Sequence, residues 1–198
     1  MRIIAGTFRS RALQAPPGLA TRPTTDRLRE TLFNVLAPRI GSAAFLDLYA
    51  GSGAVGLEAI SRGATHVTFI ERAPAALKVL RANLSSLAIT TGLKIQESSV
   101  AQFLRKPSAA PFDIVFLDPP WDAADDYALT LNLLGASASS LLAPDAIVIA
   151  EHRRKQTLNS QYGNLTRYRL LEQGDAALSF YKATESSTPA PASDSEKK

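Results

Sequence analysis

From residue 44 onward, short apolar segments alternate with segments of helical pattern, and this alternation limits the possible folds more than any other feature. The expected strands are, in chain order, 44–48, 66–71, 93–97, 112–118 and 146–152. The expected helices between them are 55–62, 74–87, 99–106 and 124–142. Short, continuously apolar strands separated by helices are typical of a parallel sheet that is covered on both faces. The sequence therefore predicts an α/β fold with a mostly parallel sheet.

Both ends of the chain depart from this alternation. Residues 166–183 have the pattern of two strands joined by a Gly-Asp turn, which predicts an antiparallel hairpin at one edge of the sheet. Near the start, 2–5 and 11–15 flank a turn and predict a short hairpin, and a helix is expected over 26–38. The expected organisation is an N-terminal extension over 1–41, one α/β domain over 42–183 and a disordered tail over 184–198.

The residue types that the chain lacks exclude several kinds of chemistry. It has no cysteine and only 2 histidines, His66 and His152, which flank strands and are expected at the surface or at helix ends rather than in catalysis. Disulfides, thiolate nucleophiles and Cys-ligated zinc are therefore excluded, and most Ser-His-Asp sites are disfavoured. No apolar run approaches the roughly 18 residues of a membrane span, and the first residues do not resemble a secretory signal. We expect a cytoplasmic protein, a monomer, with no metal site and no membrane partner.

Positive charge is concentrated at the N-terminus. Residues 1–41 contain seven arginines, no lysine and two acidic residues, a net charge of +5, while the whole chain carries +4. An arginine guanidinium can bind a phosphate group through two hydrogen bonds and can stack on a base. The extension therefore suits nucleic acid, although a solvated charged surface explains the same charges equally well.

A glycine motif follows the first expected strand of the α/β domain. Gly51, Gly53 and Gly56 form the pattern G-x-G-x-x-G between a strand and a helix, where glycines permit a sharp turn and close approach of a ligand. Glu71 ends the next strand, 20 residues after Gly51, where a carboxylate can accept hydrogen bonds from ribose hydroxyls. These features indicate a cofactor that contains a nucleoside.

Asp47 restricts the choice of cofactor. It lies four residues before Gly51, at the end of the strand. A carboxylate there would repel the pyrophosphate of a nicotinamide dinucleotide, but it suits a ligand that carries positive charge. S-adenosylmethionine, with its ammonium and sulfonium groups, is such a ligand. A tight turn without a ligand is the alternative interpretation of the glycines, and their place between a strand and a helix, together with Glu71, disfavours it.

A second motif, Asp118-Pro119-Pro120-Trp121, follows the strand 112–118. Prolines donate no main-chain hydrogen bond, so the motif offers only acceptors, the main-chain carbonyls and the Asp118 carboxylate, beside the aromatic ring of Trp121. Such a site suits a planar base with an exocyclic amine, since hydrogen bonds from the amine can aim its lone pair at a methyl group. Stacking on Trp121 would contribute about 1–3 kcal/mol. A rigid turn with a packed tryptophan remains the alternative.

The residues assembled so far resemble a known family. RIIAG near the start, RPTTDRLRETLFN at 22–34, DLYAGSGAVGLEAISRGA at 47–64 and DPPW at 118–121 are similar, in order and spacing, to the bacterial small-subunit ribosomal RNA guanine-N2 methyltransferases. The likeness spans about residues 2–183. It implies a seven-stranded, Rossmann-like class I methyltransferase fold, S-adenosylmethionine as donor, and a guanine in the 16S rRNA of the small ribosomal subunit as acceptor.

The resemblance also implies roles for particular residues. Cofactor binding is expected from Asp47, Tyr49, Ala50, Gly51, Ser52, Gly53, Glu71, Arg72 and Ser99. The amine is expected to be held by Asp118, Pro119, Pro120 and Trp121. RNA contacts, or the ordering of a loop over the active site, are expected from Arg9, Arg11, Arg22, Thr24, Asp26, Arg27 and Arg29. Two positions depart from the family pattern: Trp121 replaces a Phe or Tyr, and Ser99 stands where an Asn or Asp commonly meets the adenine amine.

Other functions remain open from the sequence alone. Asp-Pro-Pro followed by an aromatic residue also serves methyltransferases that act on DNA adenine or cytosine, or on protein glutamine. A non-catalytic RNA-binding protein with a vestigial methyltransferase fold is a further alternative. A nicotinamide oxidoreductase is the least favoured, because no evident proton donor lies near the motifs.

Overall fold

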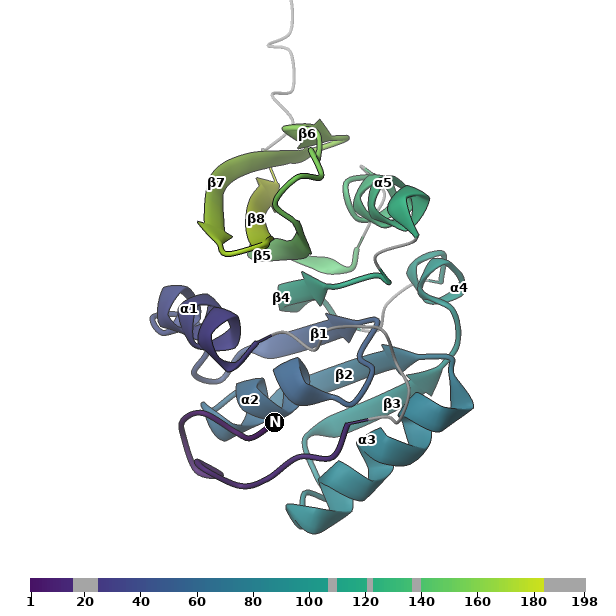
Figure 1. Cartoon of the computed structure of the whole chain (residues 1–198). Coiled ribbons are helices and arrows are strands. Elements are labelled where there is room, and N and C mark those ends of the chain that lie inside the picture. The colour runs from purple at the N-terminus through teal and green to yellow at the C-terminus, as the bar shows by residue number, and fades with distance from the viewer. Residues whose placement is uncertain (16–24, 107–109, 121–122, 137–139, 184–198) are drawn as a thin grey trace, which may run out of the picture.

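The computed structural model describes residues 1–15, 25–106, 110–120, 123–136 and 140–183. Its centre is an eight-stranded sheet in the order β3-β2-β1-β4-β5-β8-β7-β6 (Figure 1). The strands are β1 (Ala44–Leu48), β2 (His66–Glu71), β3 (Leu93–Glu97), β4 (Phe112–Leu117), β5 (Leu142–Arg153), β6 (Gln161–Tyr162), β7 (Leu165–Gln173) and β8 (Ala176–Ala183). β1 to β5 are parallel, and β8, β7 and β6 add to β5 in antiparallel pairs. The expected mostly parallel sheet with an antiparallel edge is confirmed.

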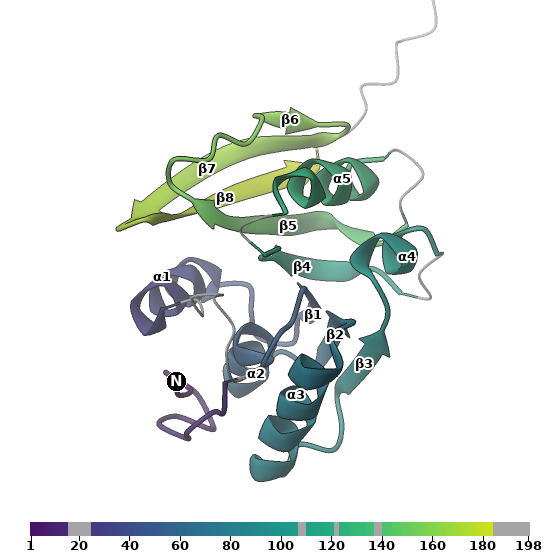
Figure 2. The same ribbon diagram turned by 45° about the vertical axis from the view of Figure 1, so that its right-hand side comes forward.

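Helices cover both faces of the sheet. Along the chain they are α1 (Asp26–Leu36), α2 (Ala54–Ser61), α3 (Pro74–Ser86), α4 (Val100–Leu104) and α5 (Ala124–Leu134). α1, α2 and α3 pack on one face and α4 and α5 on the other (Figure 2). Alternate residues of β1 enter the two cores: Phe45 packs with the first group of helices and Leu46 with the second. Burial of both faces explains why these strands are almost continuously apolar.

The register of the parallel strands brings the two sequence motifs together. Leu48 of β1 lies opposite Ile70 of β2 and opposite Leu117 of β4. The carboxyl ends of these three strands therefore lie side by side. They bring together the glycine motif after β1, Glu71 at the end of β2 and Asp118 after β4. Carboxyl ends of parallel strands are where ligands bind in open α/β sheets.

Local signals account for the helix starts. Thr25 is the N-cap of α1, and its Oγ1 accepts a hydrogen bond from the Leu28 N–H at 3.2 Å. Pro74 occupies the first turn of α3, where its missing N–H costs nothing. Ser99 and Gln102 form a capping box at the start of α4.

The helix predicted over 124–142 ends earlier than expected, at Leu134, and residues 137–139 of that prediction lie outside the described residues. Gly135 is the C-cap of α5, where β6 approaches so closely that a Cβ would lie 2.0 Å from the Tyr162 carbonyl oxygen. β5 begins at Leu142, four residues before the expected start at 146, and its register against β4 shifts between Phe112 and Ile114. This irregularity allows Pro144 to lie within a strand, where its lack of an N–H is tolerated at a bulge.

The structure also differs from the sequence predictions in the outer strands of the sheet, in the N-terminal hairpin and in the position of His152. The predicted hairpin over 166–183 is confirmed as β7 and β8, and β6 brings the sheet to eight strands rather than the seven that the resemblance implied. The N-terminal hairpin is reduced to a single bridge between Arg2 and Ala12. His152 is 2% exposed and its Nε2 bonds with the Ser179 Oγ at 2.9 Å, so its expected surface position was wrong. Among the described residues, no helix is long and apolar enough to cross a membrane.

Candidate active site

The loop between β1 and α2, which we call the glycine loop (residues 49–53), turns the chain sharply at the carboxyl edge of the sheet. Tyr49, Gly51 and Gly53 have φ angles of 62°, 56° and 80°. Glycine adopts such angles without strain, whereas a tyrosine requires support from its surroundings. That support is a hydrogen bond between the Tyr49 and Thr130 hydroxyls, 2.8 Å long, which fastens the loop to α5.

Asp47 is a buried carboxylate in β1, just before the glycine loop. It is 2% exposed, and its Oδ2 accepts a hydrogen bond from the Gly56 N–H at 2.9 Å. Burial, together with the smaller effect of the Glu71 carboxylate, raises the pKa of Asp47 from 3.8 to about 7 in spite of that hydrogen bond. A positively charged group of a ligand in the cavity would stabilise the ionised form.

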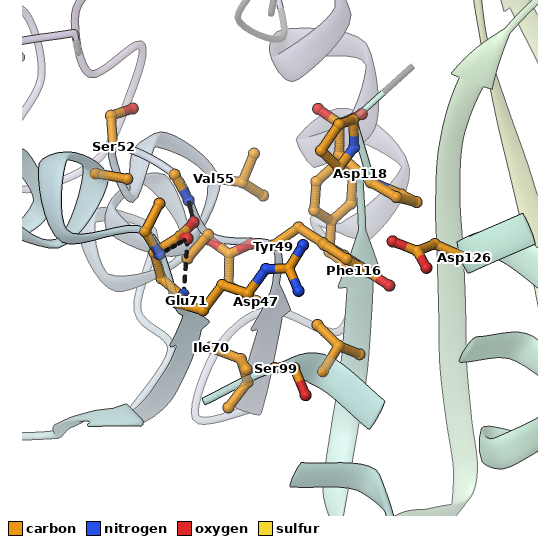
Figure 3. A pocket seen from close by; sticks show the side chains of 18 of the residues that line it. Asp47, Tyr49, Ser52, Val55, Ile70, Glu71, Ser99, Phe116, Asp118 and Asp126 are labelled. Carbon is orange, nitrogen blue, oxygen red and sulfur yellow. Dashed lines mark hydrogen bonds between the residues drawn. The ribbon is translucent and has the colours of Figure 1, made fainter. Parts of the chain in front are cut away.

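Glu71 is held in place by three main-chain donors. Its Oε2 accepts a hydrogen bond from the Gly51 N–H at 2.8 Å, and its Oε1 accepts from the N–H groups of Arg72 and Ala73, each at 2.7 Å (Figure 3). An ionised carboxylate has about four acceptor positions, so about one remains for a ribose hydroxyl. These three hydrogen bonds fix the orientation of the Glu71 carboxylate and leave it about one position at which to accept a hydrogen bond from a ligand.

A cavity of about 710 Å³ opens beside these residues. Small-molecule sites have volumes of about 300–1,000 Å³. Of the residues expected to bind a cofactor, those that line it are Asp47, Tyr49, Ala50, Gly51, Ser52, Glu71, Arg72 and Ser99. Gly53 stands behind the wall, and a Cβ there would lie 2.3 Å from the Leu80 Cδ1.

The second motif lies at the other end of the same cavity. Asp118, Pro119 and Pro120 line it, and Figure 3 shows Asp118 and Asp126 at the end away from Ser52 and Glu71. Trp121 lies outside the described residues. Burial raises the pKa of Asp118 well above its ordinary value, and the nearby carboxylates of Glu151 and Asp47 raise it further.

Two serines follow β3 on the wall of the cavity. The Ser99 Oγ accepts a hydrogen bond from the Gln102 N–H at 3.2 Å as the N-cap of α4. The Ser98 Oγ is buried and has no hydrogen-bond partner within the described part of the chain. Ser98 therefore offers an unused hydroxyl beside Ser99, the residue expected to meet the adenine.

Several lining residues were missed from the sequence, notably Ala15, Ser98, Asp126 and Leu129. Asp126 and Leu129 are three residues apart in α5 and therefore lie on one face of that helix. Because they follow the Asp-Pro-Pro motif closely, the sequence could have indicated that they line the same cavity. No sequence pattern indicates Ala15, since its place in the cavity wall depends on how the N-terminal segment packs.

The residues expected to contact RNA are placed differently from one another. Arg9 and Arg27 are exposed and line a second cavity of about 430 Å³. Arg11 is also exposed, and its guanidinium donates a hydrogen bond to the Ser86 carbonyl oxygen at 2.8 Å. Arg22 and Thr24 lie outside the described residues.

Arg29 does not have the exposed position that was expected of it. Its side chain is 0% exposed and lies 3.0 Å from the Asp26 Oδ1 and 3.8 Å from the Glu58 Oε2. Burial lowers the pKa of Arg29, and these two carboxylates oppose the shift. A guanidinium enclosed in this way is not available to RNA, and instead it joins α1 to α2.

The residues present fit S-adenosylmethionine. The cavity has a glycine-lined wall, a carboxylate in Glu71 with an open acceptor position, a hydroxyl in Ser98 without a partner among the described residues, and a buried carboxyl group in Asp47 that a cationic ligand would ionise. In the described ranges, no group of three or more His, Asp or Glu side chains is arranged to hold a metal ion.

Comparison with known proteins finds methyltransferases similar to this chain. A model of the family described as Conserved hypothetical protein 95 matches residues 1–182. Ribosomal RNA small subunit methyltransferase D of Escherichia coli K12 is 39% identical over 92% of this chain and 89% of its own length. The Bacillus subtilis protein YlbH is 34% identical over 92% of this chain and 98% of its own.

A solved structure of the Escherichia coli protein yhhF superimposes on this fold with a TM-score of 0.81. The two share 38% sequence identity, over 92% of this chain and 97% of that one. The family match covers the N-terminal segment, the glycine loop and the Asp-Pro-Pro motif together. The chain therefore belongs to the Conserved hypothetical protein 95 family, a family of S-adenosylmethionine-dependent methyltransferases that includes the ribosomal RNA small subunit methyltransferase D proteins.

Proposed function

We propose that the protein transfers a methyl group from S-adenosylmethionine to the exocyclic N2 amine of a guanine in the 16S rRNA of the small ribosomal subunit. The observation that carries the proposal is that one cavity is lined by Asp47, Glu71 and the glycine loop and also by the Asp-Pro-Pro motif. The names of the relatives support ribosomal RNA as the substrate class. The chemistry of the motif supports an amine as the acceptor.

At the cofactor end, the chain's own groups would bind and orient the donor. Asp47 would attract its positive charge, and Glu71 would accept a hydrogen bond from the ribose. The main chain of the glycine loop forms part of the cavity wall and would lie along the methionine and ribose portions of S-adenosylmethionine. The bound sulfonium supplies the methyl group.

At the acceptor end, Asp118 and the Pro119 carbonyl would each accept a hydrogen bond from the amine. The lone pair of an aromatic amine is delocalised into its ring, so these bonds would favour the pyramidal geometry in which the lone pair points at the methyl carbon. A raised pKa makes the ionised Asp118 a better acceptor for the proton that the amine must lose after transfer. Alignment within one cavity would supply much of the rate enhancement.

The basic extension, residues 1–41, would bring the RNA to the cavity. Its exposed arginines include Arg9 and Arg27, which line the second cavity, and Arg11, and these would contact phosphate groups and position the RNA. Phosphate contacts of this kind weaken as salt concentration rises. We place this reaction in the cytoplasm.

The proposal is tested by supplying labelled S-adenosylmethionine to small ribosomal subunits that lack methylation, and separating the nucleosides of the digested 16S rRNA. We expect the label to elute with N2-methylguanosine. Label on adenine, on cytosine or on another position of guanine would contradict the proposal, as would transfer to DNA in preference to RNA.

A further inference from the structure

The N-terminal segment, residues 1–15, lies along the two helices that support the cofactor end of the cavity. The Thr7 N–H donates a hydrogen bond to the Ser61 carbonyl oxygen of α2 at 2.8 Å. The Arg11 guanidinium donates to the Ser86 carbonyl oxygen of α3. A Cβ at Gly6 would lie 1.8 Å from the Ser61 carbonyl oxygen, so the approach to α2 is close enough to require glycine. The segment is therefore an integral part of the cofactor half of the molecule.

Asn83 of α3 joins this segment to the glycine loop. It is 0% exposed, and its Oδ1 accepts a hydrogen bond from the Gln14 N–H at 2.8 Å. Its Nδ2 donates to the Gln14 carbonyl oxygen at 3.1 Å and to the Ser52 carbonyl oxygen at 3.0 Å. One buried amide thus uses both of its donor hydrogens and its acceptor to hold two segments that are far apart in the sequence.

Both of the segments that Asn83 holds reach the cavity. Ser52 lines it from the glycine loop, and Ala15, the residue after Gln14, lines it from the N-terminal segment. Because one rigid side chain bonds to both main chains, a ligand that fixes the position of Ser52 also fixes Gln14. In the same way, a ligand that fixes the position of Gln14 also fixes Ser52.

We infer that Asn83 is a positioning residue that couples the cofactor loop to the N-terminal segment, so that cofactor and RNA each raise the other's affinity. The inference rests on the proposed function for the identity of the two ligands. Binding equilibria are reciprocal, so the factor by which cofactor strengthens RNA binding must equal the factor by which RNA strengthens cofactor binding. A residue that only stabilised the fold would not contribute to this factor.

The coupling is measured with S-adenosylhomocysteine, which occupies the cofactor site without turnover. The Kd of the fluorescently labelled protein for unmethylated small subunits is determined with and without saturating S-adenosylhomocysteine, for the wild type and for Asn83→Ala. We expect a ratio of about fivefold or more in the wild type and a ratio close to one in the variant. Asn132→Ala, which removes an exposed asparagine of α5, is the matched control and should keep the wild-type ratio.

Asn83→Ser provides a second variant if the alanine variant does not fold. Its hydroxyl can bond to the carbonyl oxygen of the preceding turn of α3 but is too short to hold both Gln14 and Ser52, so the ratio should again approach one. A folded variant that keeps the wild-type ratio, or a wild type with no coupling, overturns the inference. A wild type that transfers no methyl group to the subunits contradicts the proposed function instead, so the two failures are distinct.

Discussion

Three carboxylates, Asp47, Asp118 and Glu151, lie near the carboxyl ends of β1, β4 and β5. Removal from water disfavours the ionised form of a carboxyl group, and like charges at close range add to the effect. The pKa of Asp118 is accordingly raised by burial, by Glu151 and by Asp47. A cationic ligand in the cavity would relieve this repulsion, which makes the electrostatics of the site complementary to a sulfonium donor.

Replacement of Asp118 by asparagine should separate binding from chemistry. Loss of the carboxylate removes the acceptor that orients the amine, so we expect kcat to fall by about 100-fold or more. The cofactor Kd, measured by calorimetry, should change little, because Asp118 lies at the far end of the cavity from Glu71. Asp125→Asn, at an exposed position of α5, serves as the control. A loss of cofactor affinity as large as the loss of rate would refute the role given to Asp118.

Cofactor affinity should depend on pH through Asp47. Its pKa is raised from 3.8 to about 7, so the folded protein without ligand takes up a proton as the pH falls through 7. The positively charged donor favours the ionised form, and its affinity should fall by up to about tenfold per pH unit below that pKa. In Asp47→Asn, whose amide oxygen can still accept from the Gly56 N–H, the affinity should be lower at pH 8 and nearly independent of pH.

The same shift has a consequence for stability with the opposite dependence on pH. A carboxyl group whose pKa is higher in the folded than in the unfolded protein favours the folded state while it is protonated, and that contribution is lost as the pH rises from about 4 to about 7. The ligand-free wild type should therefore lose stability relative to Asp47→Asn across this range. Equal pH dependence of the two melting temperatures would argue against a buried, titrating Asp47.

At the scale of the elements, α2 approaches the sheet at Gly56. A Cβ at this helical position would lie 2.2 Å from the Phe69 Cε1 and 3.0 Å from the Asp47 Oδ2. Alanine normally stabilises a helix relative to glycine, but here overpacking should cost about 1–3 kcal/mol of unfolding free energy. Gly41→Ala, where a Cβ meets nothing within 4 Å, should change stability by no more than about 0.5 kcal/mol in urea denaturation. Similar stabilities of the two variants would contradict this account of the packing.

A buried charge joins α2 to the N-terminal segment. Glu58 is 0% exposed, accepts hydrogen bonds from the Ile4 and Ala5 N–H groups at 2.7 and 3.0 Å, and lies 3.8 Å from Arg29. Glu58→Gln would remove one of the two carboxylates beside Arg29 and also the carboxylate that pairs with Arg62 at 2.7 Å, at a cost of about 3 kcal/mol in the free energy of unfolding. Glu30→Gln, on the exposed face of α1, should be nearly neutral. A neutral result for Glu58→Gln would show that the ion pair contributes nothing to docking of the segment.

The elements also show what the sequence could and could not predict. Periodicity located β1 to β4 within a residue or so, because strands buried on both faces are continuously apolar. It failed for the end of α5, which depends on contact between Gly135 and the distant Tyr162. It failed for Arg29 for the same kind of reason, since a charge at that position is buried only because Glu58 and Asp26 converge on it. Contacts between distant segments leave no local pattern.

For the whole molecule, the N-terminal extension and the sheet meet at the wall of one cavity, which Ala15 lines from the extension. The extension carries the exposed arginines, and Asn83 connects its main chain to the glycine loop. The Asp-Pro-Pro motif reaches the same cavity from β4. One cavity is thus lined by the glycine loop, by Glu71 and by the Asp-Pro-Pro motif, and Asn83 joins the N-terminal segment to its wall, an arrangement that suits the proposed modification of a base within a large RNA.

Mass spectrometry of the 16S rRNA from a strain without the gene for this protein tests that account most directly. We predict that one N2-methylguanosine is absent from this RNA, that it returns when the wild-type gene is restored, and that it does not return with Asp118→Asn expressed at the same level. An unchanged set of methylated guanines in the deletion strain, or full restoration by Asp118→Asn, would contradict the account.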